Sequence, residues 1–238
     1  MTTSALCVVS VFPELLGTYG DGGNVEVLRQ RLAWRGLAHT VVNVALDQPV
    51  PASGDLYVLG GGEDDAQLVA LEALRGSRGL LEALDRGAHV FGVCAGLQLL
   101  GRSFSTGDGR AAEGLGALDA VTTRLAVRAV GEVVGTFDPE LGLPALTGFE
   151  NHGGATTLGP SARPLAMLSR GTGNGGGPPG AEGAVQGRVL ATYLHGPVLA
   201  RNPALADLLL SRSSGAELAE LDPGPHDLLR VQRLSGAV

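Results

Sequence analysis

The chain of 238 residues contains no lysine, and all 17 of its basic residues are arginine. A Schiff-base lysine and the phosphate-binding lysine of a Walker motif are therefore excluded. We expect that any ATP used in the overall reaction is bound by a different chain.

Cysteine is also scarce, since the chain has only Cys7 and Cys94. Two cysteines are too few for a disulfide framework or a cysteine-rich metal site, so we expect no metal and no cofactor, and a reducing cytoplasm is the default location. The formal net charge is -7 and no basic tract is present. Binding to nucleic acid therefore finds little support. No segment approaches the roughly 18 unbroken apolar residues that a membrane span needs.

Aromatic residues make up only 4% of the chain, whereas 44% of the residues are hydrophobic. A sizeable core built from alanine, valine and leucine is therefore available, and the length indicates one α/β domain with elaborations. Strands are expected at 5–12, 39–46, 55–62 and 89–93, and helices at 24–36, 65–74 and 79–87. This alternation predicts a mostly parallel central sheet with helices on both faces.

After about residue 110 the pattern changes to short β-like runs, so extra short strands are expected in the second half. A glycine- and proline-rich loop at 171–180 is predicted to be mobile and exposed. A last buried strand is expected at 188–196 and a helix at 202–212. We expect the domain to span residues 1–212, and the tail at 213–238 to contain a helix.

The stretch HVFGVCAGLQLLG, at 89–101, joins a buried strand to a helix through a very short turn. Gly92 and Gly96 flank Cys94 two residues away on each side, which is typical of a nucleophile elbow. The helix that begins near Ala95 directs its free N–H groups at the thiol and favours the thiolate. The Ala95 N–H is also placed to donate to a developing oxyanion. Cys7, inside a plain strand, is interpreted as a core residue.

A thiol nucleophile needs a base, and His195 is the first candidate because it ends the predicted strand at 188–196. Catalytic groups gather at the carboxyl ends of parallel strands. This placement brings Cys94, His195 and the glycine run at 60–62 to one edge of the sheet. His152, in the stretch GFENHGG, is the competing candidate.

Three stretches in order, LGGGED, GVCAGLQLLG and ATYLHGP, resemble those of class I (triad) glutamine amidotransferase domains. The likeness is strongest to the cobyric-acid-synthase-like, CobB/CobQ-type branch. Within it, YGDGGNVEVLRQR, GFENHGG and TYLHGPVLARNPALADLLL are similar to the GatD group. Members of that group are glutaminase subunits of lipid II isoglutaminyl synthases. The resemblance covers roughly residues 5–212.

The resemblance implies an activity and a partner. Cys94 would form a glutamyl thioester from glutamine, and His195 would protonate the departing ammonia. The ammonia would pass to a Mur-ligase-like partner, MurT, in a heterodimer. That partner would use ATP to amidate the D-glutamate α-carboxyl of the lipid II stem peptide, a step of peptidoglycan synthesis.

The resemblance also implies roles for other residues. The oxyanion would lie between the N–H of Ala95 and a backbone N–H near Gly61. Gln98 matches a glutamine that helps to hold the substrate, and Arg128 matches the arginine with which the GatD group binds glutamine. A guanidinium suits the carboxylate of the substrate because it presents a planar fork of donors.

One position departs from the family pattern. Most triad amidotransferases carry a glutamate two residues after the histidine, where this chain has Pro197. The histidine would then be oriented by a distant acid such as Glu150 or Asp207, or by a residue of the partner. Because a histidine without its orienting glutamate adopts an unproductive tautomer, we expect the isolated chain to be a poor glutaminase that the partner activates.

Three other functions stay open at this point. The chain could serve another CobB/CobQ-like amidotransferase with a different acceptor, or it could be a stand-alone cysteine hydrolase of the DJ-1 type. It could also be a binding module that kept the fold and lost the activity, although the presence of both Cys94 and His195 argues against this.

Overall fold

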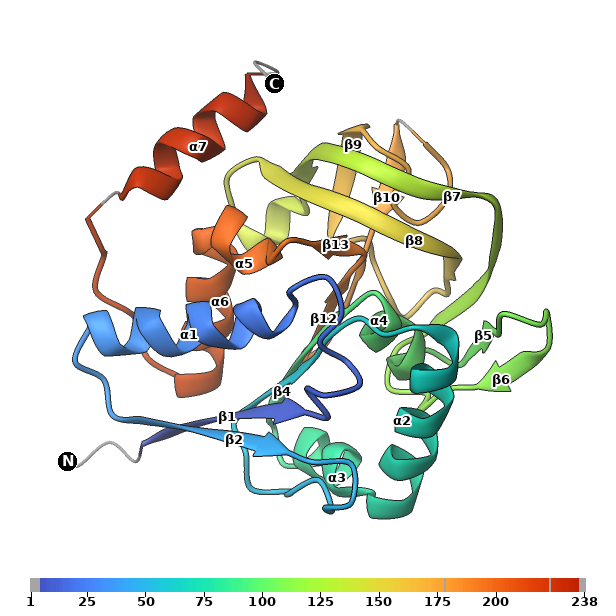
Figure 1. Ribbon diagram of the computed structural model, residues 1–238. Helices are drawn as coiled ribbons and strands as arrows, with labels where there is room; N and C mark the ends of the chain where they lie inside the picture. Colours follow the sequence, from blue (N-terminus) through green and yellow to red (C-terminus); the bar gives the residue numbers. More distant parts are fainter. Residues whose placement is uncertain (1–4, 178, 223, 236–238) are drawn as a thin grey trace.

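The computed structural model describes residues 5–177, 179–222 and 224–235. Its main sheet has six strands in the order β11-β12-β4-β3-β1-β2, all parallel except β11 (Figure 1). These strands are β1 (Leu6–Val11), β2 (His39–Val44), β3 (Leu56–Leu59), β4 (His89–Val93), β11 (Ala184–Gln186) and β12 (Val189–Thr192). The mostly parallel sheet predicted from the sequence is confirmed.

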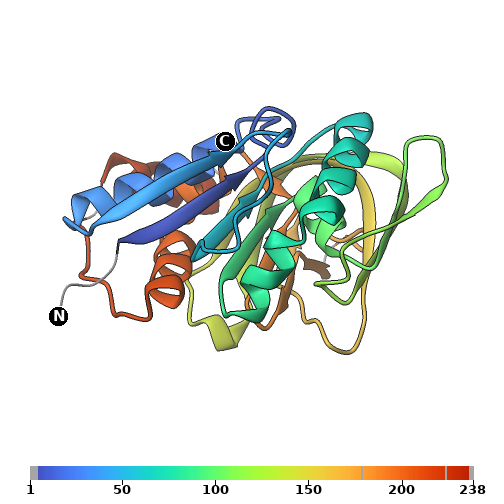
Figure 2. The same ribbon diagram turned by 90° about the horizontal axis from the view of Figure 1, so that it is seen from below.

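Helices lie on both faces of this sheet. The helices of the described ranges are α1 (Gly22–Trp34), α2 (Asp64–Ser77), α3 (Gly79–Asp85), α4 (Ala95–Leu100), α5 (Val198–Arg201), α6 (Pro203–Ser214) and α7 (Pro225–Leu234), with a 3-10 turn at Pro139–Leu141. Of these, α7 contacts α5 and β8 rather than the main sheet. Figures 1 and 2 show α1 and α6 on one side of the sheet and α2 and α3 on the other. None of the helices in the described ranges is long and apolar enough to cross a membrane.

Two hydrophobic cores follow from the alternation of side chains along the buried strands. Tyr57 and Leu59 of β3 pack in the core beneath α2, α3 and α4, whereas Leu56 and Val58 pack in the core beneath α1 and α6. All five residues of β4 are buried. A strand buried on both faces must be apolar throughout, and this explains the unbroken hydrophobic run before Cys94.

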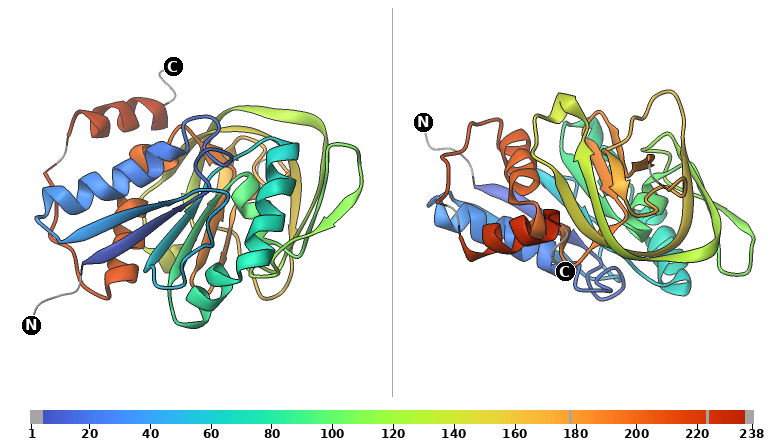
Figure 3. Two further views of the ribbon diagram at one scale, coloured as in Figure 1. Left: turned by 60° about the horizontal axis from the view of Figure 1, so that its bottom comes forward. Right: turned by 90° about the horizontal axis from the view of Figure 1, so that it is seen from above.

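A second, curled sheet is built from strands between residues 103 and 195 (Figure 3). Its strands are β5 (Ser103–Ser105), β6 (Ala111–Glu113), β7 (Ala120–Phe137), β8 (Leu146–Leu158), β9 (Ala166–Arg170), β10 (Gly180–Glu182) and β13 (Leu194–His195). Short strands were expected here, but β7 and β8 have 18 and 13 residues. Their pairing shifts register between Arg124 and Ala129, an irregularity that re-aims the intervening side chains.

The second sheet reaches the end of the main sheet through β13, which pairs with β8 so that His195 lies opposite Phe149. The loop predicted at 171–180, of which residue 178 lies outside the described residues, is less exposed than predicted at residues 172–174. Its Thr172 and Gly173 N–H groups donate to the Glu150 carboxylate, and Asn174 is buried. The predicted tail does contain a helix, α7, whereas the boundary at residue 212 stays a prediction.

Candidate active site

Cys94 stands alone between the end of β4 and the start of α4, in a backbone conformation with φ 52° and ψ -102°. A positive φ is costly for a residue with a side chain, and such strain is concentrated at functional sites. The turn is held in place by the Cys94 N–H, which donates to the Thr192 carbonyl, and by the Gly96 N–H, which donates to the Gly60 carbonyl. The geometry is that of the elbow predicted from the sequence.

Gly96 and Gly92 are required by this close packing. A Cβ added to Gly96 would lie 2.5 Å from the Leu59 carbonyl oxygen, and one added to Gly92 would lie 2.8 Å from a Leu100 methyl carbon. Both positions therefore need glycine so that α4 can start directly against the sheet.

His195 lies at the same edge of the sheet as Cys94 and is almost fully buried, with 1% of its surface exposed. The Cβ position of Gly61 is 2.8 Å from the His195 ring and 3.5 Å from the Cys94 Cβ, so all three residues meet at one point. The His195 Nε2 atom has no hydrogen-bond partner in the described residues. This nitrogen is the one that a general acid–base must keep free for the substrate.

The other ring nitrogen of His195 is held by Asp21, which the sequence reasoning missed. His195 Nδ1 donates to the two carboxylate oxygens of Asp21 at 2.9 and 3.1 Å, and Asp21 is 1% exposed. The carboxylate also accepts the Gly61 N–H at 2.8 Å. A buried carboxylate on Nδ1 fixes the ring orientation and stabilises the imidazolium.

The two acids suggested by the sequence have other partners. Asp207 pairs with Arg31 at 2.5 Å and with Arg35 at 2.9 Å. Glu150 accepts backbone N–H groups from 171–180 and lies 3.5 Å from His152. Neither of them forms a hydrogen bond to His195 within the described ranges.

The Asp21–His195 pair changes the protonation of the histidine. Burial lowers the pKa of His195, but the Asp21 carboxylate and the neighbouring Cys94 outweigh it and raise the pKa to about 10. The imidazolium form of His195 is therefore stable at neutral pH beside Cys94.

A pH-dependent contribution to stability follows, because this pKa lies above the ordinary value of 6.5. The interaction contributes fully below pH 6.5 and is lost as the pH rises through about 10. We expect the gap in free energy of unfolding between the wild type and Asp21→Asn to narrow steadily from pH 6.5 to pH 10. Urea unfolding at a series of pH values measures it, and a gap that stays constant over this range would contradict the assignment.

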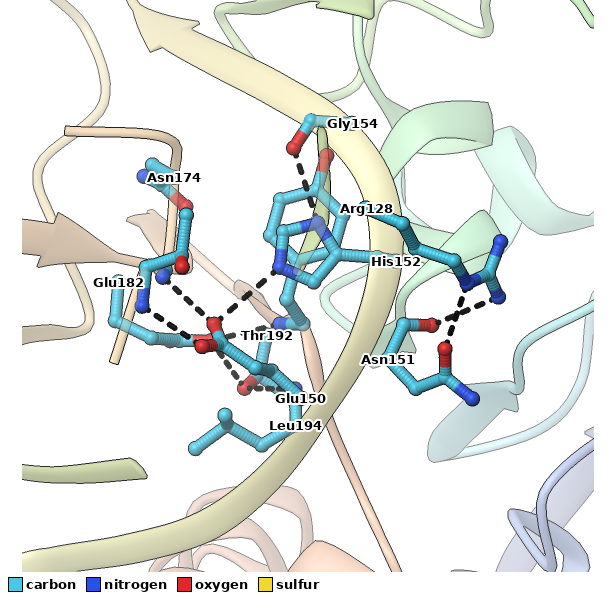
Figure 4. Close-up of polar contacts among 12 residues, drawn as sticks. Arg128, Glu150, Asn151, His152, Gly154, Asn174, Glu182, Thr192 and Leu194 are labelled. Carbon is cyan, nitrogen blue, oxygen red and sulfur yellow. Dashed lines mark hydrogen bonds and ion pairs between the residues drawn. The ribbon is translucent and has the colours of Figure 1, made fainter. Parts of the chain in front are cut away.

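His152, the competing base, lies deeper in the second sheet. Its ring stacks on Tyr193 at a centroid distance of 3.9 Å, and its Nδ1 lies 3.0 Å from the Gly154 carbonyl oxygen. Figure 4 shows Glu150 and His152 on one side of β8, whereas Asn151 and Arg128 lie on the other. The ring of His152 lies against Tyr193 and Glu150, and the residue lines the wall of the pocket. His195, and not His152, is the histidine that lies with Cys94 around Gly61.

Buried hydrogen bonds to Glu182 hold the segment that leads to His195. The carboxylate of Glu182, fully buried, accepts the Thr192 hydroxyl at 2.8 Å and the Tyr193 N–H at 2.7 Å. Burial raises the pKa of Glu182 to about 7. Glu182 was not singled out from the sequence, because a glutamate in a glycine-rich stretch gives no signal of burial.

Gln98 and Arg128 line the same pocket as Cys94, together with Tyr19, Glu63 and Asn151. The Gln98 amide is positioned by its neighbours, since its oxygen accepts from the Gln67 side chain at 2.8 Å. Its nitrogen lies 3.5 Å from the hydroxyl of Tyr193.

The Arg128 guanidinium is fixed at the pocket wall by Asn151. Its Nε donates to the Asn151 side-chain oxygen at 2.7 Å, and its Nη2 donates to the Asn151 carbonyl at 3.3 Å and to the Tyr19 hydroxyl at 3.1 Å. Of the guanidinium nitrogens of Arg128, Nη1 is the one without a hydrogen-bond partner among the described residues. Its N–H groups are therefore the donors left for a substrate carboxylate.

The two predicted oxyanion donors differ in their surroundings. Ala95 is the first residue of α4, where the backbone N–H groups have no partner within the helix. The Gly61 N–H already donates to Asp21, so it would have to leave that carboxylate to reach an oxyanion. Both roles stay predictions.

The fold is that of glutamine amidotransferases. A crystal structure of a glutamine amidotransferase matches with a TM-score of 0.58 at 20% identity, over 88% of this chain and 99% of that one. A second, from Thermotoga maritima, matches with a TM-score of 0.54 at 18% identity, over 96% and 90% of the two chains.

The family follows from the sequence. Residues 7–203 match the model of the CobB/CobQ-like glutamine amidotransferase domain, and the chain belongs to this family. It is 33% identical to the lipid II isoglutaminyl synthase (glutamine-hydrolyzing) subunit GatD of Staphylococcus aureus, over 87% of this chain and 84% of the relative. It is 31% identical to GatD of Streptococcus pneumoniae, over 87% and 79%. The cobyric acid synthase of Caulobacter is 35% identical over 77% of this chain but only 38% of its own length. The chain is thus a glutamine-hydrolysing enzyme subunit similar to GatD.

Proposed function

We propose that this chain hydrolyses glutamine through a thioester on Cys94 and supplies the ammonia to a Mur-ligase-like partner of the MurT type. The partner would bind ATP and amidate the D-glutamate α-carboxyl of the lipid II stem peptide. The observation that carries the proposal is the placement of Cys94 at a strained elbow beside a buried His195–Asp21 pair.

The chemistry assigns one task to each group. The Cys94 thiolate attacks the side-chain amide carbon of glutamine, and the His195 imidazolium gives its proton to the nitrogen that departs as ammonia. His195, now neutral, takes a proton from water as the water attacks the thioester, and glutamate leaves with the Cys94 thiolate restored. The sum is glutamine and water giving glutamate and ammonia.

The acceptor is supported by the relatives. Two subunits named for lipid II isoglutaminyl synthase are similar to this chain over most of their length, whereas the similarity to the cobyric acid synthase covers only 38% of that protein. The absence of lysine agrees with an ATP site on another chain. A cytoplasmic location is part of the same proposal, because ATP and the Mur-ligase-like partner are used there.

The assay that tests this function combines the purified chain, its Mur-ligase-like partner, ATP, glutamine and lipid II. We expect amidated lipid II only when both proteins are present, and ammonium chloride should replace glutamine when this chain is left out. If glutamine is consumed but lipid II is not amidated in the presence of the partner and ATP, the proposed acceptor is wrong and the glutaminase assignment stands.

Arg128 is proposed to bind the α-carboxylate of glutamine. Arg128→Ala is expected to raise KM for glutamine by about ten- to a hundredfold with a small change in kcat, the loss typical of one charged hydrogen bond. Arg128→Lys should restore little, because an ammonium group cannot hold Asn151 and the substrate together. Steady-state glutaminase kinetics measure both, with Arg124→Ala, on the same pocket, as the control. A KM for Arg128→Ala equal to that of the wild type would rule the role out.

A further inference from the structure

Glu63 lines the pocket of Cys94, and its carboxylate is linked to Arg128 through a single hydroxyl, that of Tyr19. The Tyr19 hydroxyl accepts from Arg128 Nη2 at 3.1 Å and donates to Glu63 Oε1 at 3.1 Å. An arginine and a carboxylate of opposite charge are thus attached to one hydroxyl in one pocket. In the part of the chain that the structure describes, Glu63 forms no ion pair.

The chemistry of the substrate matches this arrangement. Free glutamine carries an α-carboxylate and an α-ammonium group on a single carbon, so its two charges are held a short, fixed distance apart. If Arg128 binds the carboxylate, the ammonium group needs an acceptor close by, and a negatively charged one binds it most strongly. Glu63 offers such an acceptor, because it lines the same pocket and shares the Tyr19 hydroxyl with Arg128.

We propose that Glu63 binds the α-ammonium group of glutamine, and that the Tyr19 hydroxyl sets the separation between this acceptor and Arg128. The inference rests on the proposed function of the pocket. With this contact the pocket would select free glutamine over an analogue that lacks the α-amino group. It would also select free glutamine over a glutamine residue whose α-nitrogen is in a peptide bond.

Tyr19 is well suited to this positioning task. Burial, then the hydrogen bond to the Glu63 carboxylate, raises the pKa of Tyr19 above its usual value, so the hydroxyl keeps its proton at neutral pH. Its backbone has a positive φ of 60° and its ring packs edge-on against His195 at 5.1 Å. The loop that carries it is pinned by the Thr18 N–H, which donates to the Gly61 carbonyl.

The neighbouring acid is less suited to the role. Asp64 also lines the pocket, but its carboxylate packs against Gly107 in the turn between β5 and β6, where an added Cβ would lie 2.1 Å from Asp64 Oδ2. Asp65 lies outside this pocket and is exposed. It therefore provides a control of the same charge at the same end of α2.

The test compares the binding of glutamine with that of 4-carbamoylbutanoate, which is glutamine without its amino group. Calorimetry is performed on the Cys94→Ala protein, which cannot hydrolyse glutamine or the analogue. If a partner co-purifies with the chain, the complex is used in every titration. Glu63→Gln keeps an oxygen for the Tyr19 hydroxyl and removes only the charge. We expect it to weaken glutamine binding by about ten- to a hundredfold and to change binding of the deaminated analogue by less than about twofold.

Two further variants sharpen the comparison. Glu63→Asp keeps a carboxylate and should keep most of the preference for glutamine, and Asp65→Asn should keep all of it. A ratio of the two dissociation constants that is the same in Glu63→Gln as in the parent protein overturns the proposal, as does the absence of any preference in the parent. Failure of the proposed function is seen separately, as a wild-type protein that releases no glutamate from glutamine.

Discussion

Cys94→Ala is expected to abolish glutamine hydrolysis while the protein stays folded. Among the described residues that line the pocket, Cys94 is the one thiol, so its removal closes the thioester path. Loss of the nucleophile from a hydrolase costs on the order of 10⁶ in kcat. Alanine is the matched replacement because it keeps a Cβ at the positive φ of the elbow, so the backbone strain is unchanged. Release of ammonia and glutamate measures the rate, and circular dichroism and the melting temperature report the fold.

Cys7→Ala is the control for this experiment. Cys7 lies in β1, where it is partly buried against the core, so its replacement should lower stability slightly and leave kcat unchanged. A Cys94→Ala protein that is folded and hydrolyses glutamine at a rate near that of the wild type would remove the nucleophile assignment.

Asp21→Asn is expected to lower kcat by roughly 10⁴, with little effect on KM, since an amide in this position favours the wrong tautomer of the histidine. The change is nearly isosteric, and Asp21 is buried against His195 and the Gly61 N–H, so steric effects should be small. His195→Ala should be similarly impaired, and steady-state kinetics at saturating glutamine measure both.

Glu150→Gln and His152→Ala provide the comparison. Both residues are buried close to the active site, but neither forms a hydrogen bond to His195 in the described chain. We expect them to affect stability more than kcat. The opposite result would be a loss of about 10⁴ in kcat for Glu150→Gln together with normal activity for Asp21→Asn. That result would show that Glu150, and not Asp21, orients His195.

Much of the fold could be predicted because the signals are local. The run HVFGV is apolar throughout since β4 is buried on both faces, and the glycines around Cys94 are needed where α4 meets β3. The lengths of β7 and β8 could not be predicted in this way, because their one exposed face interrupts the hydrophobic pattern with polar residues.

Asp21 was missed because its role depends on a contact across 174 positions of the chain. In the sequence it stands in GTYGDGG, where an aspartate between glycines is typical of a turn. One signal was present: the loop follows β1, which lies beside β3 in the sheet, and acids after parallel strands gather at the same edge. The family pattern places the orienting acid at position 197, and this chain has Pro197 there, at the N-cap of α5. The pattern therefore gave no indication of Asp21.

The presence of Asp21 also alters the expectation for the isolated chain. A low activity without the partner was predicted because no orienting acid was identified, and the chain itself supplies one. Any activation by the partner would then act on another feature of the site. One such feature is the Gly61 N–H, which donates to Asp21 and so is not free for an oxyanion.

The central claim, that Cys94 attacks the side-chain carbonyl of glutamine, is tested most directly by trapping with the chloroketone analogue of glutamine. The wild-type protein is treated with the reagent, digested, and its peptides are analysed by mass spectrometry. The account predicts one adduct, on Cys94, that forms in step with the loss of glutaminase activity and is slowed by glutamine and by Arg128→Ala. An adduct on Cys7 alone, or full inactivation with Cys94 unmodified, would contradict it.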